Sequence, residues 1–309
     1  MGSNSQSYTE AQVIARLREI FKKSDPRLEV GIGDDAAVVA GSARQVMTTD
    51  MAVEGVHFRT DWSSPFEIGR KVAAANSADI LAMGALPNFL LVAVALTGRE
   101  DLDWIEELAR GIKDEADLAG FTVIGGDISR SEKIVITISA IGSCERAITR
   151  DGARVGDGIY LSSLTGWSAA GLSILENLVT ATTKAQEKAL QEYKAPSIDY
   201  KFDTNRATAL CDISDSLIEQ ATQLSLASEV KLEFNIESIS KVEEFAELES
   251  VAVAMGVDIW QWIFGGGEDH ALLATGQGLP GLLIGKVVPG SGLAGVPSNL
   301  KVNTWNHFG

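Results

Sequence analysis

Apolar residues along the chain follow two kinds of pattern, which predict helices interleaved with short strands. Helical patterns, most of them with apolar residues every three or four positions, predict helices at residues 13–21, 64–83, 102–118, 167–178, 182–193, 215–224 and 243–255. Alternating or continuous apolar runs predict strands at residues 88–96, 121–124, 133–141, 157–162, 229–236, 270–275, 282–288 and 302–305. Because the order is not a regular βαβ repeat, the pattern predicts an α/β (α+β) fold and disfavours a Rossmann sheet.

A change in composition divides the pattern into two parts. Charged residues and glycines gather at residues 145–156, between the strand predicted at 133–141 and the next one at 157–162. A chain of 309 residues is long enough for two domains. We therefore predict one domain at residues 1–147 and a second at residues 148–309.

The stretch from residue 31 to residue 58 combines polar groups with two short apolar runs. The runs at 38–40 and 46–47 predict a strand pair, and the second run leads into Thr48, Thr49 and Asp50. Asp34 and Asp35 precede the first run, and as neighbours in extended backbone they point to opposite faces. Only one of the two can then join Asp50 in a cluster.

Acidic groups recur at the ends of other predicted elements, and this recurrence has two interpretations. The groups lie at residues 76–79, 125–127, 212–215 and 266–269. Each alone is ordinary turn chemistry facing solvent, but their regular position at element ends favours a shared site. Carboxylates that converge repel one another, so such a cluster predicts a divalent cation, and all-oxygen ligands suit Mg²⁺.

Composition narrows the classes of partner. The net charge of −16 and the lack of a Lys/Arg-rich run exclude a nucleic-acid surface. The two cysteines, Cys144 and Cys211, lie far apart, which predicts neither a disulfide framework nor a cysteine metal site. No apolar run is long enough to cross a membrane, and no signal peptide is evident, so we expect a cytoplasmic protein.

Seven ordered segments carry a resemblance to a known family. They are GIGDDAAVV, TTDMAVEGVHF, NSADILAMGA, GGDISR, RDGARVGD, DISDSL and GGGEDHAL. In this order they resemble the thiamine-monophosphate kinase family, part of the ATP-binding superfamily that includes aminoimidazole ribonucleotide synthetase. The resemblance implies a two-domain fold whose N-terminal ATP/Mg-binding sheet pairs across a homodimer. It implies direct, Mg²⁺-assisted phosphoryl transfer from ATP to thiamine monophosphate, which gives thiamine diphosphate.

The resemblance also implies roles for individual residues. The family's magnesium ligands match Asp35, Thr48, Thr49, Asp50, Asp79, Asp127, Asp212 and Asp215. Positions that touch ATP in the family match Gly126, Arg150 and Ser214, and substrate positions match His57, Glu268 and Trp305. No residue is assigned as a nucleophile or general base, because phosphoryl transfer depends mainly on positioning and charge neutralisation.

Three departures from the family pattern leave alternatives open. Trp167 replaces the usual Asp, Ser216 replaces the usual Gly, and His270-Ala271 replaces the usual Tyr-Glu. These changes bear on specificity for thiamine more than on the use of ATP. The alternatives are another ATP-using member of the superfamily, such as aminoimidazole ribonucleotide synthetase, or a nucleotide sensor without catalysis.

Overall fold

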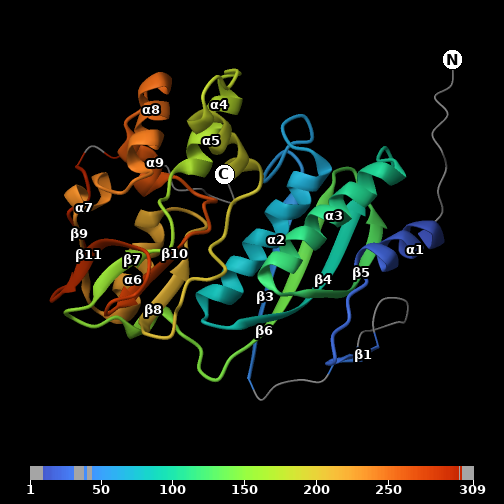
Figure 1. Cartoon of the computed structure of the whole chain (residues 1–309), viewed down its shortest axis with the longest axis horizontal. Helices are drawn as coiled ribbons and strands as arrows, with labels where there is room; N and C mark the ends of the chain where they lie inside the picture. Colours follow the sequence, from blue (N-terminus) through green and yellow to red (C-terminus); the bar gives the residue numbers. More distant parts are fainter. Residues whose placement is uncertain (1–9, 31–37, 40–43, 299, 301–309) are drawn as a thin grey trace. The chain divides into compact units, whose positions relative to one another are not determined.

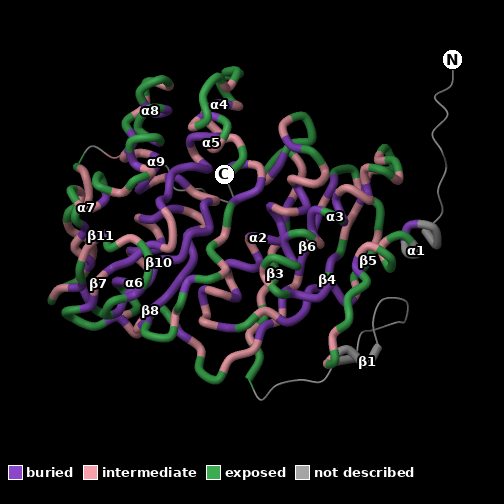
Figure 2. The backbone as a smooth tube through the Cα atoms, viewed as in Figure 1, coloured by how far each residue is buried: buried purple, intermediate pink, exposed green. Residues whose placement is uncertain are grey.

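Two separate folding units make up the chain in the computed structural model (Figure 1). The structure describes residues 10–30, 38–39, 44–298 and 300. The N-terminal unit consists of Met1–Ile80 and Ala85–Glu145, and the C-terminal unit consists of Leu81–Gly84 and Arg146–Gly309. Each unit has its own buried core along its strands (Figure 2). The mixed α/β fold predicted from the sequence is confirmed.

A four-stranded sheet forms the centre of the N-terminal unit. Its strands lie in the order β3 (Gln45–Val53), β6 (Val135–Ser143), β4 (Leu86–Leu96) and β5 (Thr122–Arg130). Strand β6 is antiparallel to both neighbours, whereas β4 and β5 are parallel and are joined by a helix. Strands β3 and β5 are therefore the two edges of the sheet.

Helices cover one face of this sheet. Helices α2 (Pro65–Ala82) and α3 (Leu102–Ala119) lie side by side in Figure 1, and α1 (Glu10–Ile20) packs beside α3. The two larger helices approach closely at Gly69 and Gly111, where a Cβ on Gly111 would lie 2.0 Å from the carbonyl oxygen of Phe66. Residues from both helices join strand residues in one apolar core.

The opposite face of the sheet exposes apolar side chains. Burial alternates along β3, so that Met47, Thr49 and Met51 are exposed whereas Thr48, Asp50 and Ala52 are partly or fully buried. Met47 is 65% exposed and Met51 is 58% exposed, and Leu91 of β4 adds to the same face. Successive side chains of a strand point to opposite faces of the sheet, so every second residue of β3 faces the helices and the others lie on the open face.

A six-stranded mixed sheet forms the centre of the C-terminal unit. Its order is β12 (Gly292–Ala294), β9 (Lys231–Phe234), β11 (Leu282–Val288), β7 (Gly158–Leu161), β10 (Leu272–Gly276) and β8 (Ala207–Asp212). The helices of this unit are α4 (Trp167–Glu176), α5 (Lys184–Lys194), α6 (Leu217–Ser228), α7 (Ile236–Ser240), α8 (Phe245–Met255) and α9 (Ile259–Gly265), with a 3-10 turn at Arg150–Gly152. Side chains from helices and strands share one large core.

The structure corrects two local expectations and leaves a third untested. The predicted pairing of residues 38–40 with 46–47 is wrong, because β2 (Val38–Val39) pairs with β1 (Leu28–Val30) and β3 pairs with β6. The Gly-Gly-Asp segment at 125–127 is not a loop after a short strand but lies inside β5. The strand predicted at residues 302–305 lies outside the described residues.

Candidate active site

Thr48 and Asp79 bring strand β3 and helix α2 together on the covered face of the N-terminal sheet. The Thr48 hydroxyl donates to Oδ2 of Asp79 across 2.6 Å. Asp50 lies two positions along β3 from Thr48, so its side chain belongs to the same face. The structure thus gathers two of the sequence-predicted ligand positions and directs a third to the same side.

A buried amide adds an acceptor near this pair. Asn76 is fully buried one turn before Asp79 on α2, and its amide donates to the carbonyl of Val72. Its Oδ1 atom has no hydrogen-bond partner among the described residues. A buried acceptor without a donor is costly, and a set of hydroxyl, carboxylate and amide oxygens is the ligand chemistry of Mg²⁺. These residues therefore fit the cation expected from the sequence.

Thr49 and Asp127 lie on the open face of the same sheet, at its two edges. Thr49 pairs with Ser139, whose hydroxyl donates to Oγ1 of Thr49 across 3.0 Å. Asp127 pairs with Ala93, and both Asp127 and Thr49 are exposed. Three strand spacings separate β3 from β5, which is about 14 Å. Within one chain, the structure does not bring Asp127 to Thr49 or to the Thr48–Asp79 pair.

Gly126 has a steric reason to be glycine inside β5. A Cβ at this position would lie 1.8 Å from the carbonyl oxygen of Val92 on the neighbouring strand. The glycine allows the two backbones to approach, and the strand then carries Asp127 to the open face. Gly126, which matches a family position that touches ATP, therefore also has a structural role in the sheet.

His57 follows β3 in a turn that fixes its ring. Its backbone amide donates to the carbonyl of Val53, and its Nδ1 atom accepts from the amide of Val53 across 3.1 Å. An Nδ1 that accepts a hydrogen bond leaves the proton of a neutral ring on Nε2. His57 can therefore offer an N–H donor from Nε2 while its ring orientation is held by backbone.

Two segments of the C-terminal unit run side by side and carry several predicted site residues. Glu268 donates its amide to the carbonyl of Ser214 across 2.7 Å, and His270 donates to Ile213 across 2.9 Å. Gly267 makes this approach possible, because a Cβ there would lie 2.4 Å from the carbonyl oxygen of Asp215. The structure thus places Asp212, Ser214, Asp215 and Glu268 in one small region.

Helix α6 begins at Leu217, two residues later than the predicted helix at residues 215–224. Ser216 is its N-cap, and the Ser216 hydroxyl accepts from the backbone amide of Glu219. The departure from the family's glycine is therefore a helix cap. Ser214 and Asp215 remain in the segment between β8 and the helix, where the Ser214 hydroxyl accepts from the side-chain amide of Gln220.

Asp212 ends strand β8 and is buried with two polar neighbours. Its Oδ2 atom lies 3.3 Å from Nδ1 of His270, so the departure at position 270 places an imidazole against a predicted metal ligand. Burial and the charge of Asp212 raise the pKa of the adjacent Cys211 thiol to about 12, although the nearby Arg150 side chain opposes this shift. The Arg150 side chain therefore lies close to the Cys211 thiol.

Asp269 is a structural residue that the sequence did not distinguish from its neighbours. Its buried carboxylate accepts from the backbone amides of Gly166 and Ser168 at 2.8 and 3.0 Å, at the start of helix α4. Burial raises its pKa to about 6, against the lowering effect of those two hydrogen bonds. Asp269 therefore ties α4 to the segment that carries Glu268.

The remaining positions are placed less directly. Asp35 and Trp305, predicted as a metal ligand and a substrate contact, lie outside the described residues. Trp167, the other departure, is buried at the first position of α4 with Lys188 over its ring.

Within the part of the chain that the structure describes, no group of three His, Cys, Asp or Glu residues is arranged to hold a metal by itself. No described helix is both long and apolar enough to cross a bilayer.

The class of protein follows from these features together with comparisons to known proteins. Residues 33–144 match the family model for AIR synthase related protein, N-terminal domain. A solved structure of the hydrogenase maturation protein HypE in complex with ATP has the same fold, with a TM-score of 0.69 at 16% identity over 92% of this chain and 88% of that one. The chain therefore has the AIR synthase-related fold.

The particular family follows from closer relatives. The thiamine-monophosphate kinase of Corynebacterium glutamicum is 36% identical over 254 residues, which cover 79% of this chain and 76% of that protein. A structure of AaThiL complexed with AMPPCP and TMP matches with a TM-score of 0.78 at 29% identity, over 99% of this chain and 100% of that one. The chain belongs to the thiamine-monophosphate kinase family.

Proposed function

We propose that this chain transfers the γ-phosphoryl group of ATP directly to the phosphate of thiamine monophosphate. The bond from the γ-phosphorus to the β,γ-bridging oxygen breaks, and a bond to an oxygen of the acceptor phosphate forms. The products are ADP and thiamine diphosphate. The observation that carries the proposal is family membership over most of the chain, supported by a similar structure with AMPPCP and TMP bound.

The acceptor explains why no general base is assigned. A phosphate monoester has a second pKa near 6, so its oxygens are already deprotonated at neutral pH. The obstacle is then electrostatic, because two anions must meet on a protein whose net charge is −16. The site must supply positive charge and exact alignment more than it must remove a proton.

Charge neutralisation is assigned to Mg²⁺ and Arg150. The ligand positions expected for Mg²⁺ are Asp35, Thr48, Thr49, Asp50, Asp79, Asp127, Asp212 and Asp215. When bound, the cation withdraws charge from the phosphate oxygens and orients them. Arg150 adds a guanidinium that suits phosphate oxygens, and its side chain lies close to Cys211, the residue before Asp212.

The other polar residues bind and position the two substrates. Gly126 and Ser214 contact ATP in this proposal. His57, Glu268 and Trp305 contact the thiamine monophosphate, and the ring of His57 is oriented by its bond from the Val53 amide. The domain roles follow as an ATP/Mg-binding and dimerisation domain at 1–147 and a second α/β domain at 148–309.

A homodimer through the open face of the N-terminal sheet is part of the proposal. The exposed Met47, Met51 and Leu91 supply an apolar surface for it. If the open faces of two protomers pack about a two-fold axis parallel to the strands, each β3 edge lies opposite the partner's β5 edge. Thr49 of one protomer then approaches Asp127 of the other, although they are about 14 Å apart within one chain.

The experiment is a measurement of ADP release with ATP and Mg²⁺, with and without thiamine monophosphate. Turnover that needs the acceptor and stops with EDTA supports the kinase reaction and its metal. ATP binding without turnover on any acceptor supports a nucleotide sensor instead. ATP turnover that needs an acceptor other than thiamine monophosphate would favour another ATP-using member of the superfamily, such as aminoimidazole ribonucleotide synthetase.

A cytoplasmic location completes the proposal. Both Cys144 and Cys211 are free thiols in the structure, which suits a reducing compartment. ATP, the phosphoryl donor of the proposed reaction, is available in that compartment.

A further inference from the structure

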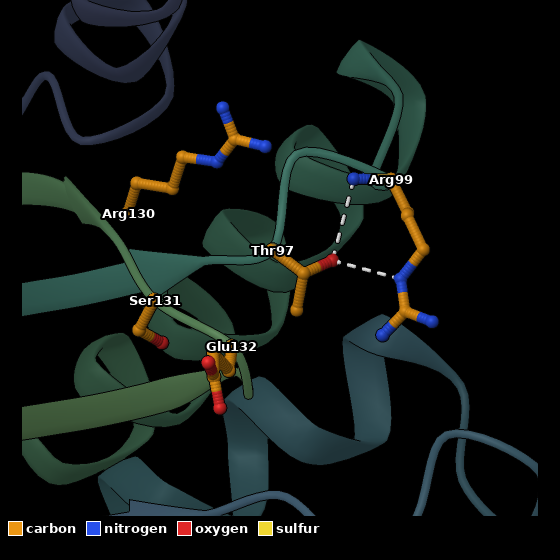
Figure 3. A pocket seen from close by; sticks show the side chains of 5 residues that line it. All are labelled: Thr97, Arg99, Arg130, Ser131 and Glu132. Atoms are coloured by element: carbon orange, nitrogen blue, oxygen red, sulfur yellow. Dashed lines mark hydrogen bonds between the residues drawn. The ribbon is translucent and has the colours of Figure 1, made fainter.

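Two arginines face a hollow at the ends of strands β4 and β5 in the N-terminal unit (Figure 3). The hollow has a volume of about 480 Å³ and is lined by Thr97, Arg99, Arg130, Ser131 and Glu132. Leu96 pairs with Arg130 at the last register position of the two parallel strands. The hollow thus lies at the carboxyl ends of adjacent parallel strands, where ligand sites of α/β sheets are often found.

The Arg130 guanidinium lies flat over the backbone of Gly98. Its Cζ, Nε and Nη2 atoms are each 3.7 Å from the position that a Cβ on Gly98 would occupy. Gly98 has a φ of +84°, a conformation that favours glycine and so keeps this surface open. The arginine plane is therefore supported on one side by the loop after β4.

Arg99 is held by the same loop. Its Nε atom donates to Oγ1 of Thr97 across 3.1 Å, as Figure 3 shows. The Glu100 carboxylate accepts from the Thr97 amide and hydroxyl and from the Gly98 amide, at distances between 2.7 and 3.0 Å. These hydrogen bonds hold the loop in one conformation, so the backbone position of Arg99 is fixed.

Neither guanidinium forms an ion pair with a carboxylate of the described residues. Arg27, Arg70 and Arg110 of the same unit, in contrast, all pair with carboxylates. Glu132 lines the hollow but is not in ion-pair contact with either arginine. Two guanidinium groups thus remain available to an anion from solution.

The hollow is separate from the residues assigned to ATP and Mg²⁺. Asp127 and Arg130 are three positions apart in β5, so their side chains point to opposite faces of the sheet. Ile128, which shares the face of Arg130, packs in a cluster with Leu96 and Ile105 of the helix-covered side. Arg130 therefore belongs to the covered face, whereas Asp127 belongs to the open one.

We propose that this hollow is a second anion site, which binds one phosphate group as free phosphate or as a phosphate monoester. Guanidinium groups match the geometry of phosphate oxygens and bind them with charge-assisted hydrogen bonds. The carboxylate of Glu132 repels additional negative charge, so the site selects a single phosphoryl group over a polyphosphate such as that of ATP.

The experiment is calorimetric titration of the full chain with inorganic phosphate, at constant ionic strength and with EDTA present. The wild-type chain should bind one phosphate per chain at this site. Arg99→Gln and Arg130→Gln should each weaken binding at least about ten-fold, because each removes a charge-assisted contact. Glu132→Gln should strengthen binding about three-fold, because it removes a like charge.

Two control variants separate this site from other sources of binding. Arg110→Gln removes an exposed, ion-paired arginine of α3 and should leave phosphate binding unchanged. Arg150→Gln removes the arginine assigned to ATP and should also leave it unchanged. Phosphate binding that is lost in Arg150→Gln but kept in Arg130→Gln would overturn the proposal, as would equal binding by all variants.

A titration with phosphoethanolamine distinguishes the two sources of the phosphate group. Binding of the ester with the same dependence on Arg99 and Arg130 identifies a monoester ligand. Binding of inorganic phosphate alone identifies free phosphate, and both results support the site. Binding of neither ligand at millimolar concentration would contradict it.

Discussion

The hydroxyl of Thr48 lies 2.6 Å from Oδ2 of Asp79, which joins strand β3 to helix α2 in the N-terminal unit. The bond directs one carboxylate oxygen of Asp79 to the strand. Asp50 shares the face of Thr48, and the unsatisfied Oδ1 of Asn76 lies one helical turn away from Asp79 in sequence. These oxygen atoms are the chemistry that an oxygen-bound cation requires.

Asp79→Asn tests that arrangement. The variant keeps the shape of the side chain but removes its charge, so kcat should fall by about 100-fold, the scale expected when a charged group that stabilises the transition state is lost. Titration with Mn²⁺, followed by electron paramagnetic resonance, should show weaker metal binding. Asp103→Asn, at an exposed position of α3, is the matched control and should alter neither quantity. Unchanged metal binding in Asp79→Asn would refute its assignment as a ligand.

Gly267→Ala tests the pairing of the two segments in the C-terminal unit. The added methyl would lie 2.4 Å from the Asp215 carbonyl oxygen and 2.8 Å from that of Ser214, so backbone must move. We expect a loss of about 1–3 kcal/mol in the free energy of unfolding and at least a ten-fold fall in kcat/KM. Steady-state kinetics and urea denaturation measure the two effects.

Gly265→Ala supplies the control for that substitution only two residues away. A Cβ on Gly265 meets no atom within 4 Å, and this residue is the last of helix α9. The variant should therefore retain activity and stability. A similar loss in both alanine variants would show that the close approach at Gly267 is not the cause.

Local patterns in the sequence predicted most of the larger elements of the fold. Helix α2 begins at Pro65 as the Ser64–Glu67 capping box indicates, and its reciprocal hydrogen bonds are present. Helix α3 ends at Gly120, which has the left-handed conformation expected of a C-cap. Caps of this kind depend on neighbours in the chain, so sequence is enough to locate them.

Pairing between distant segments was not predictable in the same way. Strand β8 was not predicted, because ATALCD is a short run of small residues, and only its pairing with β10 makes it a strand. The sequence predicted a strand at residues 46–47, but the partner of β3 is β6, which lies about ninety residues away, and not the expected local hairpin partner. The contact of His270 with Asp212 depends on the same long-range pairing of β8 with β10.

The proposed dimer predicts that charge on the open sheet face will separate the protomers. Met51→Glu places a carboxylate in an apolar surface that must lose water on association. The variant should elute as a monomer in size-exclusion chromatography with light scattering, and kinase activity should fall with it. Leu118→Glu is the matched control, because Leu118 is 57% exposed against 58% for Met51 but lies on α3. A dimeric, active Met51→Glu variant would exclude this face as the interface.

The raised pKa of Asp269 predicts how the stability of the fold depends on pH. Burial raises its pKa to about 6 in the folded chain, from an ordinary value of 3.8. Because the folded state holds this proton more tightly than the unfolded state, the group stabilises the fold most when protonated, below about pH 4. That contribution is lost as pH rises to about 6 and amounts to about 3 kcal/mol for a shift of about two units.

Comparison with Asp269→Asn isolates this contribution from that of the other carboxylates. The amide does not titrate, but it can accept from only one of the Gly166 and Ser168 amides without opposing the other. The difference in urea midpoint between wild type and variant should therefore change between pH 4 and pH 7, with the wild type losing its relative advantage as pH rises. A difference that stays constant over this range would mean that Asp269 is ionised at pH 4 as well, and that its two backbone hydrogen bonds outweigh its burial.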